Sequence, residues 1–208
     1  MMFSIIIPAH NSAKYIRKAL DSVRDQSFKD YELIVVCDAC TDNTKEIAQE
    51  YTAKVLEIDK HSSSAARNAA LDIAQGEWVL FCDADDWYLH EFAFEQLAEK
   101  VGKEHEDVLL FSLIWRYIGY GKIRSPKGTI YPHVANKCWR RSSIGATRFP
   151  VKVRLGEDEN FFLAMKAKGI KMVEWDMPLY YYNYLFEGSK SVGEQRTPEK
   201  TKQYWSNH

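Results

Sequence analysis

The chain has 208 residues, of which 46% are hydrophobic and 13% aromatic, so it can build a sizeable core and wholesale disorder is not expected. Its 28 basic and 29 acidic side chains leave a formal net charge of -1, which gives no electrostatic case for binding nucleic acid or an anionic membrane. The start, MMFSIIIPAH, lacks the basic leader and the length of a signal peptide, and no segment approaches the roughly 18 to 20 apolar residues of a membrane helix, so we expect a cytoplasmic protein without a transmembrane segment.

Apolar strands alternate with helices through the first 82 residues. In chain order the patterns predict a strand at Phe3–Ile7, a helix capped by Asn11-Ser12, a strand at Leu33–Cys37, a helix from a cap at Thr41–Asn43 to about Tyr51, a strand at Val55–Ile58, a helix from Ser62–Ser64 to Gly76, and a strand at Trp78–Cys82. This alternation is typical of a parallel sheet with right-handed crossovers.

The pattern loosens in the second half. It predicts a helix at Leu89–Gly102, a strand at Val108–Trp115, a hairpin or mobile loop at Tyr117–Ile130, a helix at Glu157–Lys168 ended by Gly169, strands at Lys171–Trp175 and Leu179–Tyr184, and a loosely held polar tail from Glu187. No linker separates residues 1–115 from residues 116–208. We therefore expect one α/β domain, with a mostly parallel central sheet flanked by helices and a smaller C-terminal part.

Polar residues follow each of the first four strands, in the segments Pro8–Asn11, Asp38–Asp42, His61–Ser64 and Asp83–Asp86. In an open parallel sheet, ligands bind outside the carboxyl ends of the strands, so these segments are the candidate site. There is no G-x-G-x-x-G after the first strand and no G-x-x-x-x-G-K-[ST] anywhere. Dinucleotide and Walker-type sites are therefore disfavoured.

Asp83-Ala84-Asp85 places two carboxylates two residues apart, directly after an apolar strand. Hard divalent cations such as Mg²⁺ and Mn²⁺ prefer oxygen ligands, and a bound cation would relieve the repulsion between neighbouring acids. The alternative is a solvated acidic loop that caps the helix starting near Leu89.

The four cysteines do not form the spacing of a disulfide framework. Cys37-Asp38-Ala39-Cys40 matches C-x-x-C, so a thioredoxin-like redox protein is one alternative, and a zinc site that borrows Cys82 is another. Two ordinary thiols in a strand-to-helix turn are the favoured interpretation, because a second pair of zinc ligands is missing.

Three stretches together resemble a known family. SIIIPAHNSAKYIRKALDSVRDQSFKDYELIVV, SSSAARNAALDIAQGEWVLFCDADDW and RFPVKVRLGEDENFFL are similar to glycosyltransferases of family 2, which have the Rossmann-like GT-A fold and serve bacterial cell-surface polysaccharide synthesis. The resemblance covers residues 3–115 well and residues 136–185 more loosely. It implies that residues 1–115 bind a nucleotide sugar and that residues 116–208 form the acceptor-binding half and the tail.

The activity implied by this resemblance is a metal-dependent, inverting transfer of a sugar. The donor would be a nucleotide-diphosphate sugar, a UDP-sugar above all, and the cofactor Mn²⁺ or Mg²⁺. The acceptor would be a hydroxyl of a glycan, a lipid-linked molecule or another compound, in surface glycan synthesis. Peripheral membrane contact and a homo-oligomer stay open, and nucleic acid is not expected as a partner.

Roles at individual positions also follow from the resemblance. On the donor side, Pro8, Ala9 and His10 would lie along the nucleotide, Asp38 would accept the base N–H, and Arg67 would approach the base or the diphosphate. The sequence departs from the family pattern at His10, where an aromatic residue is usual, and at Cys37, where a carboxylate is common.

Five more positions complete the expected site. Asp85 would bind the metal that bridges the diphosphate, and Asp83 would reach the ribose or the metal. Asp158, in GEDEN, matches the catalytic base, with Glu157 beside it on the substrate side. Trp87, next to the acids, is a candidate for contact with the acceptor.

Three rival functions share parts of this pattern. A nucleotidyltransferase would need a glycine-rich basic loop after the first strand, and PAHNSAKY is not one. A catalytically altered protein that only binds the nucleotide sugar stays an alternative, as does the redox protein that uses Cys37 and Cys40.

Overall fold

The structure is a computed structural model that describes residues 1–117, 121–124, 133–153 and 156–183. Its described strands form one nine-stranded sheet with the order β3-β2-β1-β4-β8-β6-β9-β5, and β7 pairs with β6 outside this path. No helix in the described ranges is long and apolar enough to cross a membrane. The predicted tail from Glu187, and most of the predicted hairpin at Tyr117–Ile130, lie outside the described residues.

The first four strands form the parallel part of the sheet, as predicted. They are β1 (Phe3–Ala9), β2 (Tyr31–Asp38), β3 (Ala53–Ile58) and β4 (Trp78–Phe81), and the pairs β1–β2, β2–β3 and β1–β4 are all parallel. Helices cover both faces of this part of the sheet. Its three central strands are therefore apolar on both sides and read as continuous hydrophobic runs.

The helices between these strands are α1 (Ile16–Arg24), α2 (Thr44–Gln49) and α3 (Ser63–Ile73). The helix α3 begins in the predicted segment Ser62–Ser64, and Ser62 caps it, because its hydroxyl accepts the N–H of Ala65. The predicted Asn11-Ser12 cap of α1 is wrong, since that helix begins only at Ile16. The side chain of Asn11 accepts the N–H of Thr41 at 2.8 Å instead, and so ties the loop after β1 to the loop after β2.

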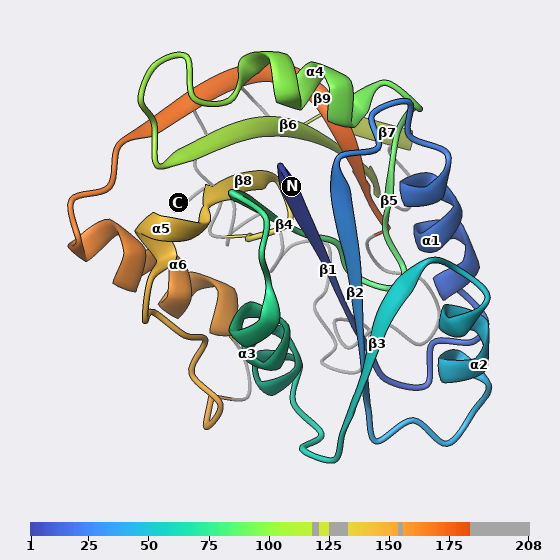
Figure 1. Cartoon of the computed structure of the whole chain (residues 1–208). Helices are drawn as coiled ribbons and strands as arrows, with labels where there is room; N and C mark the ends of the chain where they lie inside the picture. The colour runs from blue at the N-terminus through green and yellow to red at the C-terminus, as the bar shows by residue number, and fades with distance from the viewer. Residues whose placement is uncertain (118–120, 125–132, 154–155, 184–208) are drawn as a thin grey trace.

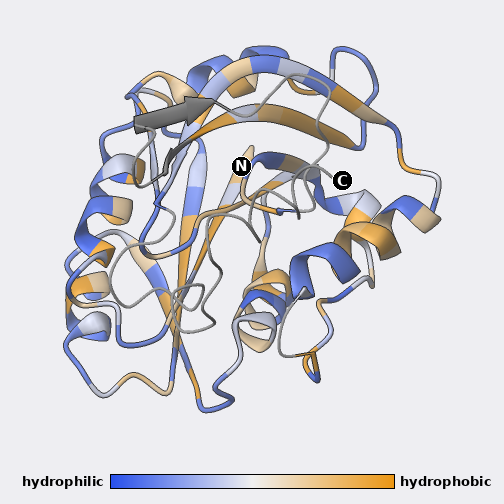
Figure 2. Cartoon of the chain, turned by 180° about the vertical axis from the view of Figure 1, so that it is seen from behind, coloured by the Kyte–Doolittle hydropathy of each residue, from blue (hydrophilic) through white to orange (hydrophobic). Residues whose placement is uncertain are grey.

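Two apolar clusters lie on opposite faces of the sheet. Alternate residues of β1 enter different clusters: Ile5 and Ile7 pack with α1, α2 and α4, whereas Ile6 packs with α3, α5 and α6. Figure 1 shows the corresponding layers, with α1 and α2 on one side of the parallel strands and α3 and α6 on the other. The hydrophobic strands run through the middle, between helices that carry hydrophilic residues on their outer faces (Figure 2).

The fourth helix is shorter than predicted. The segment Trp87–Tyr88 forms the short strand β5, which pairs with β9, and α4 spans only Ala93–Lys100. The N–H of Leu89 donates to the carbonyl of Leu179 at 2.9 Å. The predicted first turn of the helix is therefore part of the connection to the sheet.

The second half adds strands of mixed direction. They are β6 (Val108–Tyr117), β7 (Gly121–Arg124), β8 (Lys137–Arg140) and β9 (Met172–Tyr182), with helices α5 (Arg141–Ile144) and α6 (Glu157–Ala167). β8 runs antiparallel to both β4 and β6, and β6 is parallel to β9. The sheet is therefore mixed. The two predicted late strands are a single strand, whose pairing with β6 shifts register between Phe111 and Leu113.

Candidate functional site

Asp38, at the end of β2, fastens the loop that leads into α3. Its buried carboxylate accepts the backbone N–H of Lys60 at 2.7 Å, of His61 at 2.9 Å and of Ser62 at 2.5 Å. Because Ser62 in turn caps α3, the carboxylate connects the end of β2 with the beginning of this helix. This structural role was missed by the sequence reasoning, and the role in base recognition stays a prediction.

The residues predicted to lie along the nucleotide sit at the neighbouring end of β1. Pro8 and Ala9 belong to this strand and pair with Val36 and Cys37 of β2. His10 follows, exposed, with its Nδ1 at 2.6 Å from the carbonyl oxygen of Asp38, a contact that requires the proton on Nδ1. The ends of β1 and β2 thus place the first three predicted positions beside Asp38.

Arg67, on α3, joins three carboxylates from two distant parts of the chain. Its guanidinium contacts Asp83 at 2.8 Å, Asp158 at 3.1 Å and Glu157 at 3.7 Å, although the residue is only 4% exposed. Burial acts to lower the pKa of Arg67, but these carboxylates outweigh it and raise the pKa. Arg67 is therefore a permanent buried cation, and it brings together three of the residues predicted to form the site.

Asp158 lies in the first turn of α6. One carboxylate oxygen faces Arg67, and the other accepts the N–H of Val134 at 3.2 Å. Burial raises the pKa of Asp158 to about 6, against the opposing effect of Arg67. A carboxylate with this pKa is ionised near neutral pH and can still accept a proton from a substrate hydroxyl.

Glu157, beside it, reaches toward α3. Its Oε1 accepts the hydroxyl of Ser63 at 3.1 Å. The first turn of α6 is therefore attached to the first turn and the middle of α3. Glu157 also interacts favourably with the helix dipole, because a negative charge in the first turn of a helix is stabilising.

The three acids of the segment after β4 have different surroundings. Asp83 is held by Arg67, and Asp85 is half-buried. Asp86 is 1% exposed: its two oxygens accept the hydroxyl of Tyr180 and the N–H of Asn183, each at 2.7 Å. Burial raises the pKa of Asp86 well above its usual range, with the charges of Asp83 and Asp85 acting in the same direction. Asp86 is thus inside the protein, beneath the two predicted metal ligands.

Among the described residues no group of three or more His, Cys, Asp or Glu side chains is arranged to hold a metal ion. Asp83 and Asp85 are hard oxygen donors of the kind that Mg²⁺ and Mn²⁺ prefer, and Mg²⁺ usually shares its coordination shell with substrate phosphates. The donor set therefore fits a divalent cation whose remaining ligands come from a diphosphate and water.

Trp87 is packed on both faces of its ring. Tyr181 stacks on it with the ring centroids 4.1 Å apart, and the Nζ of Lys18 lies 3.1 Å from the ring centroid on the indole face. A sugar could stack on this ring only after Lys18 or Tyr181 had moved. The predicted contact with the acceptor remains a prediction.

Lys137 is a buried residue that the sequence reasoning missed. It lies on β8, and its Nζ donates to the side chain of Asn136 at 2.8 Å and to the carbonyl of His133. Burial lowers the pKa of Lys137 to about 7, while Asp158 acts in the opposite direction. Its sequence context, KCWRR, resembles an ordinary solvated basic segment, so the pattern carried no signal for burial.

The cysteines are free thiols, and three of the four are buried. Burial raises the pKa of Cys37 to about 12, with the neighbouring Cys40 acting in the same direction. A reactive cysteine needs a lowered pKa, so Cys37 lacks the property on which a thioredoxin-like role would depend.

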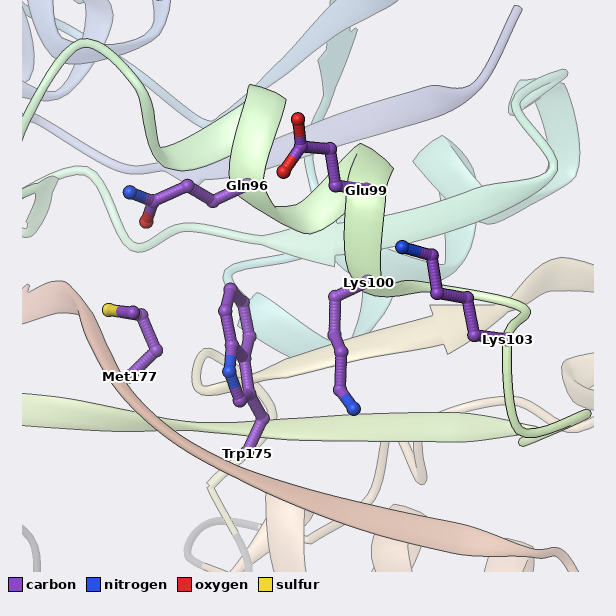
Figure 3. A pocket seen from close by; sticks show the side chains of 6 residues that line it. All are labelled: Gln96, Glu99, Lys100, Lys103, Trp175 and Met177. Atoms are coloured by element: carbon purple, nitrogen blue, oxygen red, sulfur yellow. The ribbon is translucent and has the colours of Figure 1, made fainter.

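A surface hollow of about 290 Å³ lies between α4 and β9. Figure 3 shows Trp175 and Met177 of β9 facing Gln96 and Lys100 of α4. None of its lining residues belongs to the predicted site.

The sequence pattern of the family described as Glycosyl transferase family 2 matches residues 4–156. The chain is 30% identical over 221 residues to the poly(ribitol-phosphate) beta-N-acetylglucosaminyltransferase TarS of Staphylococcus aureus, covering 96% of this chain and 38% of TarS. It is 29% identical over 209 residues to the putative glycosyltransferase EpsH of Bacillus subtilis, covering 86% of this chain and 60% of EpsH. The chain thus spans less than two thirds of either relative.

Solved structures show the same fold. TarS 1–349 of S. aureus in complex with UDP-GlcNAc superposes with a TM-score of 0.81 at 27% identity, covering 98% of this chain and 64% of that chain. The mannosyltransferase PcManGT of Pyrobaculum calidifontis, in complex with GDP-Man and Mn²⁺, gives 0.72 at 17% identity and covers 97% and 67%. These likenesses confirm the predicted GT-A fold, and the mostly parallel sheet also contains antiparallel pairs in its second half.

Proposed function

Because the chain belongs to glycosyl transferase family 2, we propose that it is a metal-dependent, inverting glycosyltransferase. The donor is a nucleotide-diphosphate sugar, with a UDP-sugar the first candidate because TarS 1–349 was solved with UDP-GlcNAc. The acceptor is a hydroxyl of a surface polymer or its precursor, a proposal supported by the relative TarS, whose name gives poly(ribitol-phosphate) as the molecule it acts on.

The observation that carries this proposal is the cluster around Arg67. Asp83 follows β4 and Asp158 begins α6, and the two carboxylates contact the same buried guanidinium at 2.8 and 3.1 Å. A sugar transferase needs a group that handles the leaving diphosphate close to a group that accepts the proton of the nucleophile. In the cluster, Asp83 is the candidate for the leaving diphosphate and Asp158 the candidate for the proton, and both contact Arg67.

Each residue then has a chemical task. Asp158 accepts the proton of the acceptor hydroxyl, since its pKa of about 6 leaves it ionised near neutral pH. Arg67 keeps Asp83 and Asp158 in place. Asp85 and Asp83 would hold Mg²⁺ or Mn²⁺, and the bound ion would supply positive charge where the leaving diphosphate develops negative charge. A single displacement in this arrangement inverts the anomeric centre.

The two parts of the chain divide the substrates in this proposal. Residues 1–115 contribute the ends of β1, β2 and β4 to the donor side, and residues 116–208 contribute Asp158 and β9 to the acceptor side. His10 and Asp38 lie beside each other at the donor edge, where the base of the nucleotide would be read.

A panel of thermal melts tests the proposal. UDP, GDP and CDP, and then UDP-sugars, are added with Mn²⁺ or with EDTA, and the midpoint of unfolding is measured. A ligand at a hundredfold excess over its Kd stabilises the folded state by about 2.7 kcal/mol. The preferred nucleotide is therefore the one that raises the midpoint of unfolding most. Stabilisation that requires Mn²⁺ is expected for one diphosphate class. The proposal fails if no nucleoside diphosphate or nucleotide sugar raises the midpoint.

A further inference from the structure

Asp86 and Tyr180 connect the acidic segment after β4 to the end of β9. The Tyr180 hydroxyl donates to one oxygen of Asp86 at 2.7 Å and accepts the backbone N–H of Asp83 at 3.1 Å. The other oxygen of Asp86 accepts the N–H of Asn183 at 2.7 Å. We refer to Asp86 and Tyr180 together as the Asp86–Tyr180 anchor.

The anchor has little freedom to move. Tyr180 is 0% exposed, and its ring packs edge-to-face against Tyr88 with the centroids 5.5 Å apart. Tyr88 and Tyr180 are also paired residues of the antiparallel strands β5 and β9. The hydroxyl that holds Asp83 is therefore fixed by strand pairing and by ring packing at once.

Both oxygens of Asp86 are already engaged by protein donors. A carboxylate used in this way is a poor candidate for a third metal ligand, although it lies next to Asp85 in the sequence. The N–H of Asp86 donates to the carbonyl of Asp83 at 3.0 Å, which closes a tight turn around Ala84 and Asp85. The position of the turn thus depends on Asp86 and Tyr180.

We propose that Asp86 and Tyr180 are positioning residues that hold Asp83 and Asp85 in the arrangement needed to bind a divalent cation together with the donor diphosphate. This inference rests on the proposed function. Residues that hydrogen-bond to metal-binding carboxylates contribute to metal affinity, because they fix the orientation of the ligands. The ligand side chains then have less conformational freedom to lose when the metal binds.

The test is a Mn²⁺ titration followed by electron paramagnetic resonance, with and without UDP. Tyr180→Phe keeps the ring and its packing but removes both hydrogen bonds, so we expect the Mn²⁺ affinity in the presence of UDP to fall roughly 10- to 100-fold. Tyr51→Phe is the matched control, because it removes a Tyr–Asp hydrogen bond of 2.8 Å between α1 and the end of α2. Its Mn²⁺ affinity is expected to equal that of the wild type.

Activity provides a second readout. In Tyr180→Phe the Mn²⁺ concentration that gives half-maximal transfer should rise, and saturating Mn²⁺ should restore much of the rate. A fold defect alone would lower the amount of active protein without moving this midpoint. Wild-type Mn²⁺ affinity and an unchanged midpoint in Tyr180→Phe would overturn the inference.

Asp86→Asn serves if Tyr180→Phe does not fold, as judged by near-ultraviolet circular dichroism. The amide oxygen can still accept from Asn183, but the amide nitrogen offers a donor where Tyr180 needs an acceptor. The same loss of Mn²⁺ affinity is expected, and wild-type affinity would refute the anchor. If the wild type itself binds no Mn²⁺ with UDP, the proposed function fails first, so the two failures are distinguishable.

Discussion

Asp158 is the residue whose ionisation decides whether the cluster can accept a proton. Burial raises its pKa to about 6, and only the ionised form can act as a base. We therefore expect kcat/KM for sugar transfer to be level near neutral pH and to fall as the pH drops through about 6, because kcat/KM reports ionisations of the free enzyme. The measurement is a pH profile of kcat/KM at saturating Mn²⁺.

Asp158→Asn is the matched variant for this profile. It keeps the shape of the side chain and removes the base, so transfer should fall by about two to four orders of magnitude while UDP·Mn²⁺ still raises the melting midpoint. Transfer at the wild-type rate in this variant would exclude Asp158 as the base.

Arg67 is a buried cation and the shared counter-ion of three half-buried acids, so we expect its removal to be destabilising. Arg67→Met removes the cation and leaves Asp83 and Asp158 facing each other, so we expect the free energy of unfolding to fall by about 3 to 5 kcal/mol at neutral pH. Without Arg67 the pKa of Asp158 should rise further. A carboxyl group whose pKa is raised in the folded state stabilises that state at low pH, and this contribution is lost as the pH rises. The difference in free energy of unfolding between the wild type and Arg67→Met should therefore be smaller at about pH 5 than at neutral pH.

Urea unfolding of the wild type and Arg67→Met at the two pH values measures this effect. Arg17→Met is the control: Arg17 forms an exposed bidentate pair with Glu50, which solvent screens, so little change is expected. An Arg67→Met deficit that is small, or that does not depend on pH, would mean that the acids are not held by Arg67.

The sequence supported the identity of the site residues better than it supported their interactions. Asp83 and Asp158 were predicted as site residues because their motifs resemble those of a family, whereas their common contact with Arg67 is known only from the structure. The role of Asp86 could not be read from FCDADDWY. It depends on Tyr180 and Asn183, which are nearly a hundred residues away and reach the acids only through the pairing of β5 with β9.

Among the loops, the one between β3 and α3 depends most visibly on a single side chain. Asp38 accepts three consecutive backbone N–H groups, and an asparagine offers one acceptor oxygen and a mismatched donor. We expect Asp38→Asn to lower the free energy of unfolding by about 3 kcal/mol, since charge-assisted hydrogen bonds to a buried carboxylate are lost. Amide hydrogen exchange at Lys60, His61 and Ser62 should become faster.

Asp59→Asn is the control for this loop, because Asp59 is exposed and lies just before the three donors. It should leave stability and exchange nearly unchanged. If Asp38 served only to recognise a base, Asp38→Asn would weaken nucleotide binding and leave the melt of the free protein unaltered. The experiment therefore separates the role predicted from the family from the role seen in the structure.

The elements that the sequence predicted are those with long apolar runs. β8 was missed because KCWR carries two basic residues, and its strand character comes from pairing with β4 and β6 rather than from composition. β9 was divided in two because Asp176 and Pro178 interrupt its apolar pattern. The register shift in the pairing with β6 absorbs this interruption, and the hydroxyl of Ser112 donates to Asp176 at 2.9 Å.

For the whole molecule, the order of the strands joins the two parts of the chain. β8 begins at Lys137, yet it lies between β4, which ends at Phe81, and β6, which begins at Val108, and it pairs with both. The apolar cluster on the α3 side likewise contains Ile6 and Val79 together with Trp139 and Phe161. Neither the sheet nor this cluster is complete with residues 1–115 alone.

This arrangement leads us to expect one cooperative unfolding transition for the whole chain. Urea melts followed by tryptophan fluorescence and by far-ultraviolet circular dichroism should give the same midpoint, because Trp78 of β4 and Trp139 of β8 are packed in adjacent, paired strands. A fragment ending at residue 117 should fail to fold, since β4 would keep one unpaired edge and Phe81 would lose its contact with Phe161. Two separated transitions, or a folded fragment that binds UDP, would show that the nucleotide-binding part is an independent domain.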